Sequence, residues 1–390
     1  MNIKMFKFFR LNIITVVIYT IQIATAQTAF HNFGDIQIHE NGQIGFHSHL
    51  INDGTFDNNL GLAGFYGDNQ LNVSGTSIAE FYNAEIDITD RLNLETTLGV
   101  YNNLDFINGK VFTPRNDISV SLDFLQATYD GDSDAEHVDG YAGLFGNIDF
   151  TFPIGDADKL RPLSISKPNT ITSFQSAYFF EDPNTPTTFA SAFDTNSFTP
   201  ILSKVSDKEF WDLNGDQEVE VTLTWDTDSD IPNLTSDINY LRVVGWNATT
   251  LRWENLGRND VSGDDESGTI TSLSFIPDNY VALTIAAEPN GNEFTINTGF
   301  SPNDDGLNDH FEINGLDLTQ ENNIEVFDRW GNNVYVKDNY DNLWGGISEN
   351  NKTYKKGTLL PVGTYYFILK IKDKITHKNK VYKGWVYINY

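Results

Sequence analysis

Acidic and amide residues at regular spacing are the first candidates for chemistry in this chain, because they suit a calcium ion. Ser301, Asn303, Asp305 and Glu312 occupy positions 1, 3, 5 and 12 of a twelve-residue calcium loop, and Gly306 occupies position 6. Serine stands where such loops usually carry aspartate, and no flanking helices are expected. The loop is therefore either a calcium site or a turn that is kept for its shape.

Paired carboxylates and tryptophans offer a second kind of chemistry, which is the binding or cleavage of carbohydrate. The chain has 54 Asp and Glu residues, so close pairs arise by chance, and none lies in a recognisable catalytic motif. Four tryptophans in the middle of the chain either form a platform that stacks on sugars or fill the core of a β-sandwich. We expect the core for these residues, which are Trp211, Trp225, Trp246 and Trp253.

The residues and motifs that the chain lacks exclude several kinds of cross-link, metal site and catalysis. It contains no cysteine, which excludes disulfides, cysteine-ligated zinc, iron–sulfur clusters and thiol catalysis. It contains no G-x-S-x-G, H-E-x-x-H or Walker motif. We therefore expect a protein that is not an enzyme and has no cofactor, with calcium as the one possible ligand.

The charge balance limits the partners that the chain could bind. Lys and Arg number 25 against 54 Asp and Glu, which gives a formal net charge of -29. Phosphate backbones and anionic bilayers attract basic surfaces, so we expect no nucleic-acid partner and no docking on an anionic membrane. The acidic excess lies almost entirely before residue 290, and the last hundred residues are nearly neutral.

The first residues have the pattern of a secretory signal peptide. Lys4, Lys7 and Arg10 are followed by a mostly apolar run over residues 11–23 and a small-residue site over residues 24–26. The apolar run is shorter than the ~20 residues that a membrane-spanning helix needs. We expect cleavage after Ala26, a mature chain without a transmembrane segment, and a secreted or cell-surface location.

The remaining chain predicts an all-β, multi-domain fold, because short alternating runs recur between turn residues. Residues 28–155 are rich in Gly and Asn and suit a β-solenoid with asparagines stacked at its corners, with a sandwich as the alternative. Residues 160–287 have the strand spacing of an Ig-like β-sandwich. A turn-rich linker at residues 289–292 precedes a third region, residues 293–390, which we predict to be an antiparallel β-sandwich of about seven strands.

Two strands of the third region show clear alternation. Residues 360–372 form a Pro/Gly turn and a strand, with Tyr365, Phe367, Leu369 and Ile371 on one face. The terminal strand places Val386 and Ile388 on one face. Between residues 323 and 335 we predict a hairpin whose turn is allowed by Gly331 and by positive φ at Asn332 and Asn333.

Four motifs follow one another in this third region. They are a Pro-Asn-x-Asp-Gly-x-Asn-Asp loop, a Phe-x-Arg-Trp-Gly-Asn strand and turn, a Pro-x-Gly-Thr-Tyr-Tyr turn, and a Lys-Gly-x-Val-x-Ile strand. The residues that match them are Pro302, Asn303, Asp305, Gly306, Asn308, Asp309, Phe327, Arg329, Trp330, Gly331, Asn332, Pro361, Gly363, Thr364, Tyr365, Tyr366, Lys383, Gly384, Val386 and Ile388.

In the order of these motifs, residues 293–390 resemble the gliding motility-associated C-terminal domain, the type B sorting domain of the type IX secretion system. The family's usual Trp-Asp-Gly reads Trp344-Gly345-Gly346 in this chain. The resemblance implies delivery to the cell surface or the medium by the type IX machinery, with a PorP/SprF-like outer-membrane protein as a partner.

The sequence thus favours an exported, non-catalytic protein with an adhesin-like or structural role. The alternative is a secreted protein that binds or cleaves carbohydrate with an acidic cleft in residues 28–287. A glycan or protein ligand of that region is not named by the sequence.

Overall fold

The computed structural model describes residues 28–289, 295–316, 318, 320–349, 354–372 and 379–390, and these are almost entirely β-structure. The chain divides into two compact units, of which one runs to residue 146 and adds residues 153–160. The other contains residues 147–152 and 161–390. The expected signal peptide and residues 290–292 of the expected linker lie outside the described residues. No described helix has the length and apolar character needed to cross a bilayer.

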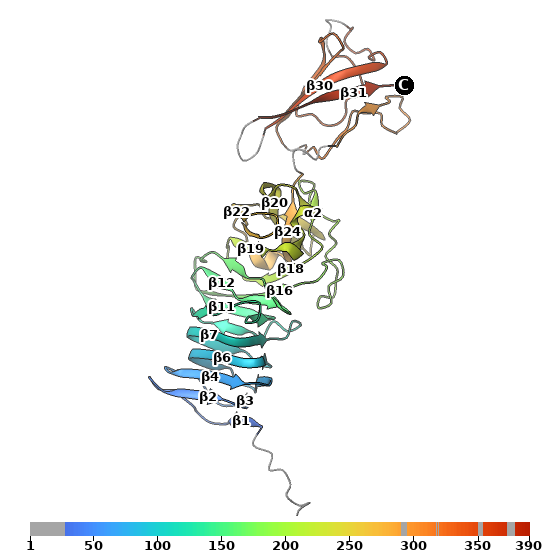
Figure 1. Cartoon of the computed structure of the whole chain (residues 1–390). Coiled ribbons are helices and arrows are strands. Elements are labelled where there is room, and N and C mark those ends of the chain that lie inside the picture. Colours follow the sequence, from blue (N-terminus) through green and yellow to red (C-terminus); the bar gives the residue numbers. More distant parts are fainter. Residues whose placement is uncertain (1–27, 290–294, 317, 319, 350–353, 373–378) are drawn as a thin grey trace, which may run out of the picture. The chain divides into compact units, whose positions relative to one another are not determined.

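The first unit is a parallel β-solenoid, as the composition of residues 28–155 predicts (Figure 1). One ladder runs through β1, β3, β5, β6, β7, β10 and β13, a second through β2, β4, β6, β7 and β9, and a third through β6, β7, β8 and β11. The strands are β1 (Ala29–Asn32), β2 (Gln43–Phe46), β3 (His49–Asn52), β4 (Leu62–Gly67), β5 (Leu71–Ser74), β6 (Ala79–Leu94), β7 (Leu98–Phe112), β8 (Leu122–Phe124), β9 (Thr128–Asp130), β10 (Val138–Asp139), β11 (Ala142–Gly146), β13 (Ile154–Asp156) and β14 (Lys159–Leu160).

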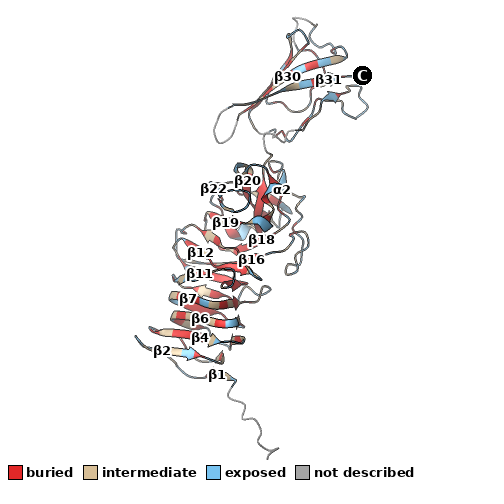
Figure 2. Ribbon diagram, in the orientation of Figure 1, coloured by how far each residue is buried: buried red, intermediate tan, exposed pale blue. Residues whose placement is uncertain are grey.

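The solenoid core is built from side chains that occupy the same position on successive rungs. Phe46, Phe65, Ile86 and Phe106 are neighbours in the second ladder, and all four are buried. The rings of Phe46 and Phe65 stack with centroids 5.0 Å apart. Figure 2 shows buried residues along the successive rungs. Because each rung covers the next one, the hydrophobic core is continuous along the ladder.

Asparagines at one corner connect successive rungs, as predicted. The Asn32 amide donates to Asn52 Oδ1 at 2.8 Å, and the Asn52 amide donates to the carbonyl oxygens of Ser77 and Ile78 at 3.1 and 3.2 Å. Both asparagines are buried, with 3% and 0% exposure. The corner therefore satisfies backbone groups that turn away from the parallel ladders.

Replacing Asn52 with alanine should destabilise the solenoid by about 2–4 kcal/mol, because it leaves buried polar groups on three rungs without their partner. Urea unfolding of the mature chain, followed by far-UV circular dichroism, measures this change. Asn102 is exposed and is the matched control, for which Asn102→Ala should stay within about 0.5 kcal/mol of the unmodified protein. Equal effects of the two substitutions would contradict the structural role of the corner.

The central region is a sandwich of two mainly antiparallel sheets, followed in chain order by the third region. One sheet has the order β12 (Phe150–Phe152), β15 (Leu163–Ile165), β19 (Val221–Trp225), β23 (Gly268–Thr271) and β22 (Asp260–Gly263). The other contains β16 (Thr172–Phe179), β17 (Lys204–Val205), β18 (Phe210–Asn214), β20 (Leu241–Asn247), β21 (Arg252–Asn255) and β24 (Leu283–Ala287). The short helices are η1 (Thr227–Ser229), α2 (Ile231–Leu234), η2 (Ile238–Tyr240) and η3 (Pro277–Asn279).

The four tryptophans of the central region lie in its core. Trp211 and Trp253 have 0% exposure, Trp225 has 2% and Trp246 has 5%. Trp246 packs edge-to-face on Trp253 with ring centroids 5.6 Å apart. The core interpretation of these residues is confirmed, and they are not a platform for sugars.

The last region contains a five-stranded sheet in the order β26 (Gly299–Phe300), β31 (Asn379–Ile388), β30 (Gly363–Lys372), β28 (Asn322–Phe327) and β29 (Asn333–Asp338). A small second sheet pairs β25 (Thr295–Ile296) with β27 (Ile313–Asn314). The predicted alternation is confirmed, since Tyr365, Phe367, Leu369, Ile371, Val386 and Ile388 are all buried. The pairings among β28, β29, β30 and β31 are antiparallel, as predicted, whereas the edge strand β26 pairs with β31 in parallel.

Candidate functional site

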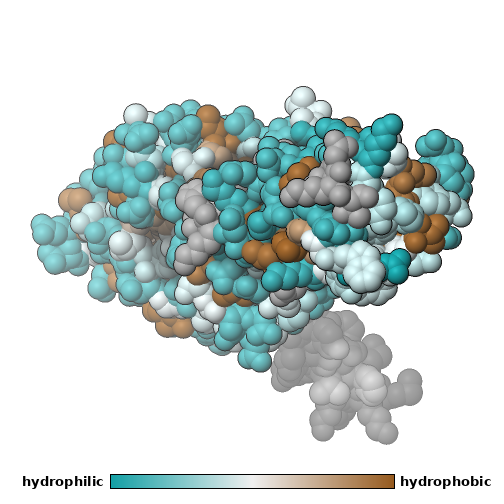
Figure 3. Space-filling model, turned by 90° about the horizontal axis from the view of Figure 1, so that it is seen from above, coloured by the Kyte–Doolittle hydropathy of each residue, from teal (hydrophilic) through white to brown (hydrophobic). Residues whose placement is uncertain are grey.

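A row of aromatic side chains crosses the outer face of the five-stranded sheet. Phe327 on β28 pairs with Tyr366 on β30, which pairs with Trp385 on β31. Alternation along each strand directs these residues away from the core that contains Phe367. Tyr366 is 54% exposed and Trp385 is 51% exposed. Most of the face seen in Figure 3 is hydrophilic. Exposed aromatic side chains that lie side by side can mark a binding surface.

The aromatic row forms part of a groove with a volume of about 620 Å³. Two cationic side chains, Arg329 and Lys383, lie at its wall, and neither forms an ion pair with another described residue. The groove thus combines apolar surface with available positive charge. Its lining consists of Phe327, Asp328, Arg329, Gly331, Tyr366, Phe367, Ile368, Lys383, Gly384 and Trp385.

The turn between β28 and β29 holds the cationic end of this groove. The Asp328 carboxylate accepts hydrogen bonds from the backbone N–H groups of Trp330 and Asn332, both at 2.9 Å, and from the Asn332 amide. Burial opposes ionisation of Asp328, but these hydrogen bonds hold its pKa below the ordinary value. Trp330 at the tip is 79% exposed. The turn is therefore a fixed platform that presents a tryptophan to solvent.

The predicted conformation of that turn needs a correction. Gly331 has φ of 81°, whereas Asn332 and Asn333 are not among the residues with positive φ. The side chain of Asn332 instead donates to Asp328. Glycine takes the left-handed position because it has no Cβ penalty there, which leaves asparagine free to act as a donor.

The first motif forms a loop around Asp309. Its carboxylate accepts hydrogen bonds from the backbone N–H groups of Asn303, Asp304 and Gly306 at 3.2, 2.8 and 2.8 Å. Asp304, Gly306 and Asn308 all have positive φ, at 61°, 83° and 55°. Only small polar residues and glycine adopt this conformation readily, so these hydrogen bonds and angles account for the residue types of the motif.

The proposed calcium ligands belong to the same loop. Asp305 Oδ1 accepts from the Leu307 backbone N–H at 2.8 Å, and Asn303 donates its amide to Asp305 at 3.1 Å. The backbone of Ser301 donates to the Asn308 carbonyl at 2.7 Å, and Glu312 is exposed. Within the described ranges, no three His, Cys, Asp or Glu side chains form a group that could hold a metal ion. Calcium binding at the loop stays a prediction.

The third and fourth motifs support the sheet beneath the groove. The Tyr365 hydroxyl donates to the Pro361 carbonyl at 2.9 Å, and this hydrogen bond closes the turn that precedes β30. Gly363 and Thr364 are the first two residues of β30. Gly384 pairs with Phe367, and a Cβ atom at Gly384 would lie 2.6 Å from the phenyl ring. Glycine is therefore required there, because the ring crosses the strand at that point.

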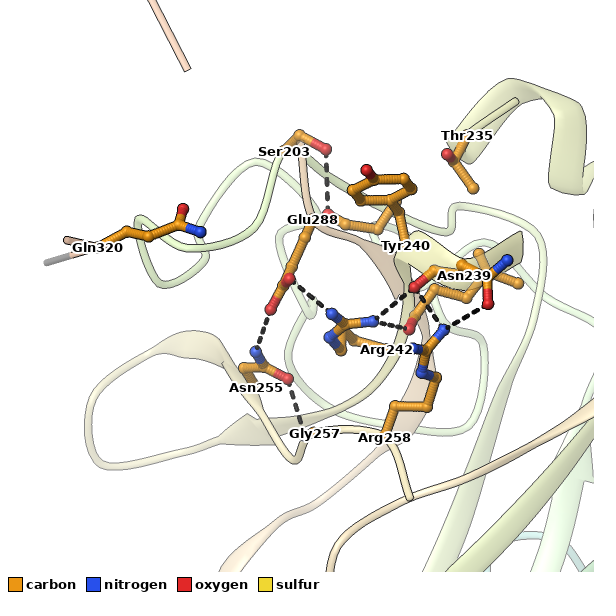
Figure 4. Close-up of polar contacts among 12 residues, drawn as sticks. Ser203, Thr235, Asn239, Tyr240, Arg242, Asn255, Gly257, Arg258, Glu288 and Gln320 are labelled. Atoms are coloured by element: carbon orange, nitrogen blue, oxygen red, sulfur yellow. Dashed lines mark hydrogen bonds and ion pairs between the residues drawn. The ribbon is translucent and has the colours of Figure 1, made fainter. Parts of the chain in front are cut away.

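A separate polar cluster lies in the central sandwich (Figure 4). Arg242 Nη2 lies 2.6 Å from Glu288 Oε2, and the Asn255 amide donates to Glu288 Oε1 at 3.2 Å. Arg242 also donates to the Leu241 carbonyl at 2.6 Å, and Arg258 donates to the Asn239 carbonyl. The guanidinium groups of Arg242 and Arg258 thus bind backbone carbonyl groups at or just before the start of β20. The Glu288 carboxylate is thus used in an ion pair and a hydrogen bond within the sandwich.

Comparison with known families decides what the last region is. Residues 294–388 match the CHU_C Type IX secretion signal domain. The resemblance drawn from the four motifs is thereby confirmed, and the chain carries a signal for export by the type IX secretion system. No curated protein and no solved structure matches the chain. The groove, the turn at Asp328 and the loop at Asp309 all lie within this secretion signal domain.

The structure divides the motif residues of the secretion signal domain into two groups. One group builds the turns and the core, and it includes Gly306, Asp309, Tyr365 and Gly384. Arg329, Tyr366 and Lys383 instead line one groove, and Trp330 is exposed at the adjacent turn. Trp385 lies in the same groove and is not a motif position, so motif comparison missed it. Its alternation with buried Val386 is the signal that could have found it.

Proposed function

We propose that this is a non-catalytic secreted or cell-surface protein with an adhesin-like or structural role, delivered by the type IX machinery through residues 293–390. The observation that supports the proposal is the groove in the secretion signal domain. Exposed motif residues from the turn after β28 and from strands β30 and β31 meet there.

The composition of the groove is that of a protein-binding site. Binding energy at interfaces concentrates in tryptophan, tyrosine and arginine, and the groove offers Trp385, Tyr366 and Arg329 together. Trp330 extends the apolar surface at the adjacent turn. We propose that the type IX machinery, through a PorP/SprF-like outer-membrane protein, binds this groove.

The upstream regions are proposed as the cargo. The tryptophans and the arginine cluster of the central sandwich are used to stabilise its core and strand ends. A repetitive solenoid offers a long regular surface, which suits adhesion or a structural role. Under this proposal the chain crosses the inner membrane with a signal peptide that is removed near Ala26.

Replacing both Tyr366 and Trp385 with alanine should reduce the exported amount of the protein about tenfold or more, because two interface aromatics together contribute more than ~2 kcal/mol. Immunoblots that compare the cell-surface and medium fractions with the cell interior, in a bacterium with a type IX system, measure the change. The variant should keep its melting temperature, since both side chains lie outside the core.

The matched control replaces Leu343 and Leu359 with alanine. These residues are 63% and 49% exposed and do not line the groove. Export of the control variant should equal that of the unmodified protein. Normal export of the groove variant, or an equal loss in both variants, would contradict the role of the groove.

A further inference from the structure

The third ladder of the solenoid has a regular inner and outer face. Phe81, Val100, Phe124 and Leu144 are neighbours on successive rungs, and all are buried. Alternation reverses the direction of the side chain along a strand, so the residue that follows each of them is expected to point outward. In the third rung this residue lies just after the end of β8. Those next residues are Tyr82, Tyr101, Leu125 and Phe145.

These four outward residues form an apolar column. Tyr82, Tyr101 and Phe145 are 36%, 45% and 47% exposed, and Leu125 is partly exposed. The backbone of Leu125 donates to the Val100 carbonyl at 2.8 Å, and the Gln126 backbone donates to the Phe145 carbonyl at 3.1 Å. These hydrogen bonds connect the second, third and fourth rungs of the column, whereas the register shifts after Phe81 on the first rung. We call these four residues the aromatic ladder.

A polar column lies beside the aromatic ladder and consists of Glu80, Gly99, Asp123 and Gly143 on successive rungs. Glu80 accepts a hydrogen bond from the Tyr101 hydroxyl at 2.8 Å, which fixes that ring. Asp123 accepts a hydrogen bond from the Ser121 hydroxyl at 2.5 Å. The Glu80 carboxylate therefore lies next to the exposed Tyr101 ring, and Asp123 is a half-buried acceptor two rungs further along.

The two glycines of the polar column leave space for side chains of the neighbouring rungs. A Cβ atom at Gly143 would lie 2.1 Å from Asp123 Oδ1, and one at Gly99 would lie 3.2 Å from side-chain atoms of Glu80 and Leu125. The glycines leave room for the carboxylates and Leu125 to lie over the neighbouring rung. Apolar and acceptor groups therefore lie in neighbouring rows on this face.

We infer that the aromatic ladder binds an extended, neutral polysaccharide along the solenoid. The flat rings of Tyr82, Tyr101 and Phe145 can stack on the apolar faces of sugar rings, while Glu80 and Asp123 accept hydrogen bonds from sugar hydroxyls. Neighbouring rungs are about 4.8 Å apart, which is comparable with one hexose unit of an extended chain. Successive sugar units of a polymer can thus contact the aromatic ladder and the polar column on successive rungs.

The charge of the surface selects against anionic polymers. Acidic side chains next to the ladder repel carboxylates, sulfates and phosphates, and the chain has a net charge of -29. A neutral polymer meets no such repulsion and supplies the hydroxyl donors that the carboxylates can accept. The inference rests on the proposed adhesive role of the upstream regions and names the class of its ligand.

Binding of the purified mature chain to amorphous cellulose, insoluble xylan and, as an anionic polymer, insoluble pectate tests the inference. We expect binding to at least one of the two neutral polymers and none to pectate. The variant Tyr101→Ala with Phe145→Ala should bind about tenfold more weakly. Tyr101→Trp should retain binding, because the indole offers a ring of similar orientation and greater area.

The control variant replaces Phe33 and Leu60, exposed solenoid residues outside the ladder, with alanine and should bind normally. The inference is overturned if neither neutral polymer is bound, if pectate is bound equally, or if the ladder variant binds as well as the control. A change of oligomeric state in the ladder variant, measured by sedimentation, would instead identify the ladder as a contact between copies. Purified protein is used, so failure here leaves the export proposal unaffected.

Discussion

Replacing Arg161 with alanine should destabilise the central sandwich by about 3–5 kcal/mol, because it leaves a buried carboxylate without its counter-charge. Arg161 is 3% exposed, and its Nε atom lies 3.3 Å from Glu209 Oε2. Its Nη2 atom lies 2.7 Å from Asp226 Oδ1. A single guanidinium therefore serves two carboxylates.

The surroundings of Glu209 explain the size of the expected effect. Glu209 is 1% exposed and accepts a hydrogen bond from the Tyr178 hydroxyl at 2.6 Å. Burial raises the pKa of Glu209, and the charge of Arg161 opposes that rise. Without Arg161, the carboxylate has to take up a proton or draw water into the core, and either change costs folding free energy.

Thermal unfolding followed by near-UV circular dichroism, which reports the buried tryptophans, measures the loss. We expect the melting temperature of the sandwich to fall by roughly 10 °C or more. The double variant Arg161→Met with Glu209→Leu should recover much of the loss, because it removes both buried charges and leaves Asp226 partly exposed to solvent.

The matched control is Arg252→Ala in the same sandwich. Arg252 is largely exposed, and its Nε atom lies 3.8 Å from Glu254 Oε1, so its loss should change stability by less than about 1 kcal/mol. If Arg161→Ala is as mild as this control, the buried charges are not coupled as the structure indicates. If the double variant is worse than the single one, the explanation by an uncompensated charge is wrong.

Alternation and composition predicted much of the fold because they are local properties. The buried series from Tyr365 to Ile371 follows directly from a period of two. Asparagine at the corners was predicted because a solenoid repeats its turn, and the structure shows that Asn32 and Asn52 are a pair that meets there. In both cases the residue types and their order along the chain were enough for the prediction.

Features that depend on contacts between distant strands were not predictable in the same way. Arg161 lies just before β15 and Glu209 just before β18, and the two segments meet only in the folded sandwich. Nothing near either residue in the sequence indicates the pair. The parallel pairing of β26 and β31 likewise depends on how the ends of the last domain meet.

The two surfaces proposed for binding also depend on contacts between strands and could not be predicted from the sequence. The groove needs the cross-strand register that aligns Phe327, Tyr366 and Trp385. The aromatic ladder was hidden because the solenoid turns differ in length and a register shift follows Phe81, so that Tyr82 and Tyr101 do not recur at a fixed spacing. Motifs identified the domain, but only the register showed which of its residues face solvent.

Removing residues 293–390 should abolish export almost completely, since the type IX secretion signal domain lies within them. The upstream regions should still fold, because the solenoid and the sandwich have their own buried cores. Far-UV circular dichroism of the purified truncated chain is the control that separates loss of export from loss of folding.

The decisive measurement is the location of a reporter protein that carries the expected signal peptide and residues 293–390, compared with one that carries the signal peptide alone. We predict that the first reaches the cell surface or the medium and that the second remains inside the cell envelope. Equal locations for the two reporters, or undiminished export of the truncated chain, would contradict the claim that the last domain is a self-contained signal for export.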